Sequence, residues 1–132
     1  MATLLDLKTG RWRGMGLPNT IVSLMEEWHP ELTRIEAIPG ADLIYDSILL
    51  RANLYGVATG RVELFKVNSA VAAKPKRIRK LRDLLDVGLL RIRYGSFVEE
   101  LFHQVENYTF TTANDGREDG ALDSLAMLCG FR

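Results

Sequence analysis

The sequence predicts a small α/β domain, because segments with the patterns of strands and of helices alternate along most of its 132 residues. The strand candidates are short apolar runs. The helix candidates are longer segments in which apolar residues recur every three to four positions. A composition of 47% hydrophobic and 26% charged residues is ordinary for a globular protein. We therefore expect a single domain over residues 1–132.

The N-terminal segments predict a hairpin followed by a helix. Residues 3–7 and 11–13 are strand candidates, and a Lys-Thr-Gly turn signal separates them. Apolar residues then recur at helical spacing from residue 17 to residue 28, with Pro18 in the first turn and Pro30 beyond the end. Both prolines agree with a helix over this range.

A strand, a helix and a second strand are expected next. Residues 32–36 form a short strand candidate that a Pro-Gly pair closes. The helix that follows ends at Gly56, and residues 62–66 resemble another strand. One face of this helix carries Leu43, Ser47, Leu50 and Leu54.

The second half of the chain continues the alternation. A helix is expected from near Pro75 to just before Gly88, and residues 89–93 are a strand candidate. The inward residues of this helix are Ile78, Leu81, Leu84 and Leu85, so most of the basic residues of the helix must face outward. Ser96 and Glu99 match a capping box that opens a fourth helix, packed through Val98, Leu101, Phe102 and Val105. A loop over 109–117 and a last helix complete the chain.

Charge is distributed unevenly, although the chain is neutral overall. Residues 74–93 contain eight Lys and Arg against two Asp, a net charge of +6. Residues 96–123 contain one Arg against seven Asp and Glu, a net charge of −6. A basic segment beside an acidic one suits a polyanion that is bound and then cut with the help of a metal ion. The alternative is two solvated helix faces that pair with each other.

Acidic residues gather where the last helix begins. Glu118, Asp119 and Asp123 precede or enter an apolar run, and positions 119 and 123 share one helix face. Two carboxylates stacked in this way repel each other, and a divalent cation is the usual compensation. Oxygen ligands suit Mg²⁺ or Mn²⁺. The alternative is that these acids interact favourably with the positive end of the helix dipole.

Glu36 is the second candidate ligand. It ends the predicted strand 32–36, directly before a turn and a helix, where side chains of open α/β sheets tend to face a site. The alternative roles are to cap the following helix or to pair with Arg34.

Two stretches resemble the nuclease domain of the large terminase subunit of tailed bacteriophages. They are residues 34–44, Arg-Ile-Glu-Ala-Ile-Pro-Gly-Ala-Asp-Leu-Ile, and residues 117–126, Arg-Glu-Asp-Gly-Ala-Leu-Asp-Ser-Leu-Ala. That family has an acid at a strand end followed by a glycine and a helix, then a Lys/Arg helix, and last an acidic pair. The resemblance implies an RNase H-like fold, with a mixed central sheet flanked by helices.

The resemblance also implies site residues. Glu36, Asp119 and Asp123 match catalytic carboxylates of the family, and Glu118 joins them as a metal ligand in the acidic pair. The implied chemistry is two-metal hydrolysis of DNA phosphodiester bonds by Mg²⁺ or Mn²⁺. The DNA-binding positions of the basic helix are Lys74, Lys76, Arg77, Arg79 and Lys80.

One part of the family pattern is missing. The family's first catalytic acid is an aspartate on the first strand, and no such strand precedes residue 3. Asp6 is the only acid before Glu26, so it is the candidate replacement. We expect an N-terminally truncated domain. The alternatives are a catalytically incomplete terminase remnant or split-gene fragment that binds DNA or a partner chain, and another RNase H-like resolvase or transposase core.

Partners and location follow from the resemblance. The implied partners are double-stranded DNA, the terminase ATPase part, the small subunit and the portal. The implied location is the cytoplasm of a bacterial host, with the chain encoded by a phage or prophage. No G-x-x-x-x-G-K-[ST] loop occurs, so no nucleotide site is expected. No apolar run reaches membrane-spanning length, and Cys129 is the only cysteine.

Overall fold

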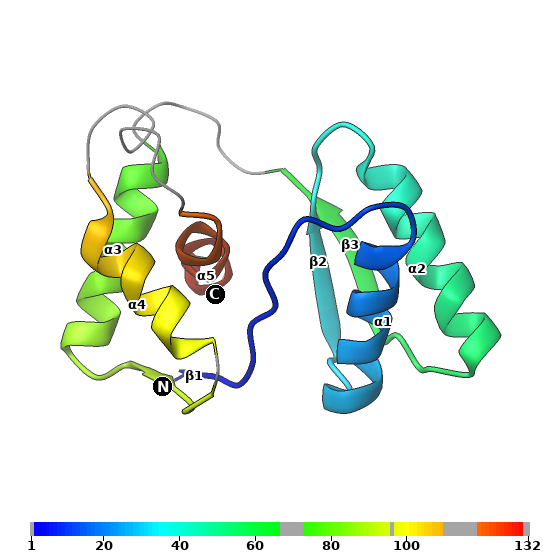
Figure 1. Cartoon of the computed structure of the whole chain (residues 1–132), viewed down its shortest axis with the longest axis horizontal. Helices are drawn as coiled ribbons and strands as arrows, with labels where there is room; N and C mark the ends of the chain where they lie inside the picture. The colour runs from blue at the N-terminus through cyan, green and yellow to red at the C-terminus, as the bar shows by residue number, and fades with distance from the viewer. Residues whose placement is uncertain (1, 67–72, 96, 110–118, 131–132) are drawn as a thin grey trace. The chain divides into compact units, whose positions relative to one another are not determined.

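The computed structural model describes residues 2–66, 73–95, 97–109 and 119–130, and the chain divides into two compact units (Figure 1). The terminal unit combines Met1–Gly10 with Asn68–Arg132, and the central unit is Arg11–Val67. Both units contain helices and parallel strands, which confirms the α/β class. One domain over residues 1–132 stays a prediction.

In the central unit, two helices cover one face of a two-stranded parallel sheet (Figure 1). Its elements are α1 (Gly16–Trp28), β2 (Leu32–Glu36), α2 (Ala41–Tyr55) and β3 (Arg61–Phe65). Helix α2 connects β2 to β3, as the alternating sequence pattern predicts, and a parallel pair requires such a crossover.

The core of the central unit lies between the helices and this sheet. Its buried residues are Val22, Met25, Ile48 and Ala52, and Ile35 and Val62 pack against them from the strands. The opposite face of the sheet is charged, because side chains alternate along each strand. There Arg34 Nε lies 2.8 Å from Glu63 Oε1, and Arg61 Nη2 lies 2.6 Å from Glu63 Oε2. Hydrogen bonds from Arg61 and then from Arg34 lower the pKa of Glu63.

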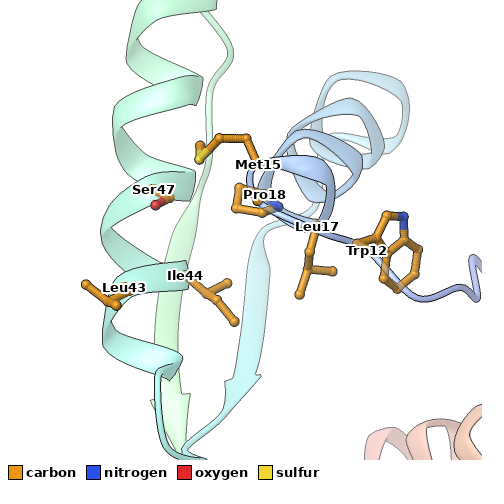
Figure 2. Close-up of a pocket in the computed structure, with 8 residues that line it drawn as sticks. Trp12, Met15, Leu17, Pro18, Leu43, Ile44 and Ser47 are labelled. Carbon is orange, nitrogen blue, oxygen red and sulfur yellow. The ribbon is translucent and has the colours of Figure 1, made fainter.

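An open cavity of about 220 Å³ lies beside the first turns of α1 and α2 (Figure 2). Leu17, Pro18 and Ile44 line it, and the Ser47 hydroxyl and the Trp12 indole N–H are its polar side-chain groups. A lining this poor in polar groups offers little to orient a charged substrate. The candidate site therefore lies elsewhere.

The terminal unit contains three helices and a second parallel strand pair. Its elements are β1 (Ala2–Leu4), α3 (Ala73–Asp86), β4 (Leu90–Ile92), α4 (Val98–Asn107) and α5 (Gly120–Gly130). Its buried core consists of Ile78, Leu81, Leu90, Leu101, Tyr108, Ala121, Leu122, Leu125, Ala126 and Cys129. Ile78 and Leu81 are buried and Leu84 and Leu85 partly buried, which confirms the predicted inward face of α3.

The predicted N-terminal hairpin is wrong. β1 ends at Leu4, and residues 11–13 are not a strand. β1 instead pairs in parallel with β4, with Ala2 opposite Leu90 and Leu4 opposite Ile92. Both strand pairs among the described residues are parallel, so the antiparallel pairing of a mixed sheet is not found in this part of the chain.

Two expectations fall partly or wholly outside the described residues. Ser96, one half of the predicted capping box, is among the residues left undescribed, as is most of the expected loop over 109–117. In the part of the chain that the structure describes, no helix combines the length and the apolar character that a membrane span requires.

Candidate functional site

The two acids of the closing segment lie where α5 begins. Asp119 immediately precedes α5, and its carbonyl accepts the backbone N–H of Asp123 at 2.8 Å. Both carboxylates are mostly shielded, with 15% of the Asp119 side chain and 19% of the Asp123 side chain exposed. They are held there because Leu122 and Leu125, on the same helix, are buried in the core of the terminal unit.

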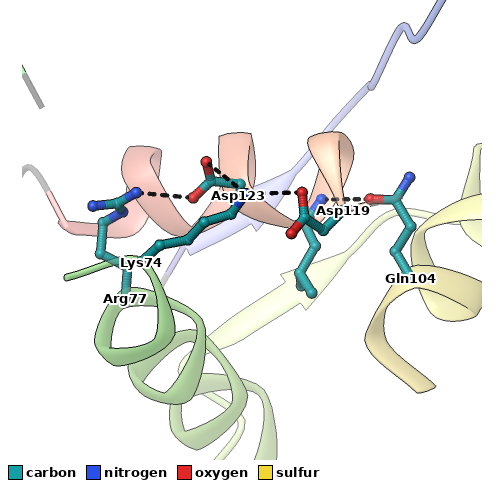
Figure 3. A network of polar contacts seen from close by, with 6 residues as sticks. Lys74, Arg77, Gln104, Asp119 and Asp123 are labelled. Atoms are coloured by element: carbon teal, nitrogen blue, oxygen red, sulfur yellow. Dashed lines mark hydrogen bonds and ion pairs between the residues drawn. The ribbon is translucent and has the colours of Figure 1, made fainter. Parts of the chain in front are cut away.

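Two basic residues of α3 meet these acids (Figure 3). Lys74 Nζ lies 2.9 Å from Asp119 Oδ1 and 3.8 Å from Asp123 Oδ2. Arg77 Nη2 lies 3.1 Å from Asp123 Oδ1. We call Lys74, Arg77, Asp119 and Asp123 the ion cluster. Its two positive and two negative charges balance.

The position of the two cations follows from the sequence of α3. Lys74 and Arg77 are one turn apart and continue the stripe that Ile78 and Leu81 bury against α5. Pro75 is tolerated between them because the first-turn N–H groups of a helix have no partner within the helix. The core packing of α3 therefore aims its first two inward cations at the start of α5.

The predicted DNA-binding residues divide into two sets. Lys74 and Arg77 are part of the ion cluster, as the alternative of two pairing helix faces requires. Lys76, Arg79 and Lys80 are exposed on the other side of α3. Lys76 and Lys80 present positive charge to solvent.

A buried glutamine joins α4 to the start of α5. Gln104 is 2% exposed, and its Oε1 accepts the backbone N–H of Leu122 at 3.0 Å (Figure 3). Its Nε2 donates to Glu100 Oε1 at 2.9 Å. The N–H of Leu122 belongs to the first turn of α5 and has no acceptor within the helix. Gln104 thus satisfies a buried donor directly beside the ion cluster.

Tyr108 adds a second buried polar group near the cluster. It follows α4 and is 9% exposed. Burial raises the pKa of its phenol, and the negative charge of Asp119 raises this pKa further. The nearby charge of Lys74 acts in the opposite direction. The phenol of Tyr108 therefore stays protonated at neutral pH.

The structure describes two further predicted ligands, Glu36 and Asp6. Glu36 ends β2 in the central unit, as expected, and is exposed. Arg34 pairs with Glu63 there rather than with Glu36. Glu118 lies outside the described residues. Asp6 accepts the backbone N–H of Leu7 at 2.8 Å and lies 3.9 Å from Lys8 Nζ.

The ion cluster offers the oxygen ligands that a hard cation prefers, but it contains only two acids. Asp119 and Asp123 offer carboxylate oxygens from one helix face, which suits Mg²⁺ or Mn²⁺. No group of three or more His, Cys, Asp or Glu side chains that could hold a metal ion occurs among the described residues. A cation at Asp119 would compete with Lys74.

Sequence reasoning missed Gln104 and Tyr108. The signal for Gln104 is its position three residues after Leu101, on the apolar face of a helix where a polar residue needs a partner. Its acceptor role could not be inferred, because Leu122 is 18 residues away in sequence.

Comparison of the chain with models of protein families, with curated protein sequences and with solved structures yields no match in any of the three.

Proposed function

We propose that this chain is a DNA-cleaving nuclease domain of the phage terminase type, with an RNase H-like fold. One observation carries the proposal: Lys74 and Arg77, from the predicted Lys/Arg motif, contact Asp119 and Asp123, from the predicted acidic motif. Lys74 and Asp119 are 45 residues apart in sequence. Two motifs that each resemble the family's pattern thus meet in one cluster.

The acids are proposed to hold Mg²⁺ or Mn²⁺. Asp119 and Asp123 would supply carboxylate oxygens, with Glu118 and Glu36 as the further ligands that the resemblance implies. A bound metal ion supplies activation of water and stabilisation of the leaving oxygen in phosphodiester hydrolysis.

The basic residues of α3 are proposed to act on DNA. Lys76, Arg79 and Lys80 are exposed and would contact backbone phosphates, which supply affinity without reading sequence. Lys74 and Arg77 neutralise the acids while DNA and metal are absent. With a metal ion held by Asp119 and Asp123, the charges of Lys74 and Arg77 would be available to a phosphate.

The proposal includes a biological setting. The chain would act on concatemeric phage DNA during packaging, in the cytoplasm of the bacterial host. Its partners would be the terminase ATPase part, the small subunit and the portal.

A second candidate is a catalytically incomplete relative that binds DNA or a partner chain. The charge balance of the ion cluster favours it, because Lys74 and Arg77 compensate both acids without a metal ion. The absence of a third acid beside them in the described part of the chain points the same way.

Plasmid cleavage with Mg²⁺ or Mn²⁺ tests the first candidate. We expect Glu36→Ala, Asp119→Asn and Asp123→Asn each to lower the rate by at least about a hundredfold. The matched control is Asp86→Asn, which removes an exposed carboxylate from the end of α3 and should leave the rate unchanged.

Two outcomes decide between the candidates. Cleavage that survives Glu36→Ala and Asp119→Asn would refute the proposed site. If the wild-type chain binds duplex DNA but does not cut it with either metal, the second candidate is correct. In that case, Lys76→Ala combined with Lys80→Ala should remove about two phosphate contacts. The binding constant should then depend less steeply on salt concentration.

A further inference from the structure

Helix α2 has apolar residues on two opposite faces, and the central unit covers only one of them. Ala41, Ile48 and Ala52 are buried against the rest of the unit. A second set of apolar side chains is far more exposed: Leu43 at 73%, Leu50 at 58% and Leu54 at 65%. A helix that is apolar on both sides is normally covered on both sides. The central unit leaves this second face of α2 uncovered.

The exposed face has the spacing of a coiled-coil seam. Leu43, Ser47, Leu50 and Leu54 follow one another at intervals of four, three and four residues. At 3.6 residues per turn they occupy a sector of about 60°. We call these four residues the α2 seam. Figure 2 shows Leu43 pointing away from α1, whereas Ile44 points toward Leu17 and Pro18.

Opposite charges flank the α2 seam. Asp46 lies on one side of it and Arg51 on the other, five residues further along the helix. These are the g and e positions that face each other across a parallel pair of helices. Neither residue forms an ion pair within the described part of the chain. In a parallel pair of α2 helices, Asp46 faces the partner's Arg51, and the two-fold axis creates the same contact a second time.

We propose that a second copy of this chain packs on the α2 seam as a parallel helix pair. A second copy fits because the surface is complementary to itself, in both its leucine spacing and its flanking charges. The reverse orientation brings Asp46 opposite Asn53 and loses both ion pairs. Ser47 lies inside the seam, and a small polar residue at one core position fixes register at some loss of stability.

Sedimentation of the full chain over a range of concentrations tests the dimer. We expect a reversible monomer–dimer equilibrium whose dissociation constant increases at least about tenfold in Leu54→Lys and decreases in Ser47→Leu. Leu128→Lys is the matched control, because Leu128 is also 65% exposed near the end of a helix but lies on α5. It should leave the equilibrium unchanged.

Charge reversal tests the parallel register with variants that leave the leucines in place. Asp46→Arg alone and Arg51→Asp alone should each increase the dissociation constant roughly tenfold. The double variant should restore it, and a mixture of the two single variants should form heterodimers. A chain that is monomeric at every concentration overturns the proposal. The α2 seam is then covered by another part of the same chain or by nothing. The proposal is also overturned by a dimer that Leu54→Lys leaves intact or that the double reversal fails to restore.

Discussion

Asp119 and Asp123 are stable one turn apart because two cations lie within reach of them. At about 4 Å and an effective dielectric constant near 20, each attraction is worth about 4 kcal/mol before desolvation is subtracted. Lys74 contacts both acids and Arg77 contacts the second. Attraction of this size offsets the repulsion between the two carboxylates. The charges of the ion cluster thus balance without a metal ion, and the proposed metal binding at this site would exchange one cation for another.

Gln104→Leu should destabilise the terminal unit. The substitution replaces the amide with an apolar side chain of similar size and leaves the buried N–H of Leu122 without its acceptor, at a cost of about 1–3 kcal/mol. Urea unfolding measures this loss. Glu106→Leu, at an exposed position of the same helix, should change the free energy of unfolding by less than about 0.5 kcal/mol. Equal effects of the two substitutions would contradict the role given to Gln104.

Tyr108 should make stability depend on alkaline pH. Its pKa is raised in the folded state, so the folded chain retains the proton where the unfolded chain loses it. The contribution of Tyr108 to the free energy of unfolding is fully present below about pH 10, the ordinary pKa of tyrosine. It is lost as pH rises through the folded-state pKa.

The measurement is the free energy of unfolding on both sides of pH 10. Wild type should lose more stability with increasing pH than Tyr108→Phe. Tyr94→Phe is the control, because Tyr94 is 94% exposed. If Tyr108→Phe and wild type show the same slope, burial does not raise this pKa.

Local patterns predict the elements of the central unit well. The pattern of residues 32–36 predicts a strand, and β2 occupies those five residues. The helical spacing from residue 17 predicts α1 to within one residue at its start. These elements are specified by side chains close together in sequence, such as the apolar residues that recur along one helix face.

Long-range contacts are the part that local patterns miss. Residues 3–7 look like one arm of a hairpin because a turn signal follows them, but β1 pairs with β4, almost 90 residues along the chain. The acids of the candidate site were identified from their spacing. Their contacts with Lys74 and Arg77 depend on how α3 packs against α5, which no single segment encodes.

The connection between β2 and β3 depends on Gly60. Gly60 has φ +62°, and an added Cβ would lie 2.5 Å from the carbonyl oxygen of Pro30 and 2.9 Å from that of Glu31. Gly56 has a similar φ, +67°, but nothing lies within 4 Å of its added Cβ. Substitutions at these two glycines therefore distinguish the cost of a positive φ from the cost of a steric clash.

Gly60→Ala should destabilise the central unit more than Gly56→Ala. Positive φ alone costs a residue with a Cβ about 1–2 kcal/mol, and the clash with backbone at position 60 should add at least about 2 kcal/mol. The comparison requires unfolding free energies of both variants. Equal losses would mean that the β2–β3 connection shifts to accept the methyl group.

The residues predicted as metal ligands are found in both units. The terminal unit contains the ion cluster, and the central unit contains Glu36 at the end of β2. The proposed dimer involves α2 of the central unit and can be tested independently of the nuclease site.

Binding of Mn²⁺ to the full chain tests the central claim, a metal site at the ion cluster, most directly. Asp119→Asn should weaken binding at least about tenfold, because it removes a ligand. Lys74→Met should strengthen binding about tenfold, because it removes a competing cation 2.9 Å from Asp119. Lys76→Met, its exposed neighbour, should have no effect. Unchanged Mn²⁺ affinity in both Asp119→Asn and Lys74→Met would contradict the account and leave the ion cluster as a purely structural contact.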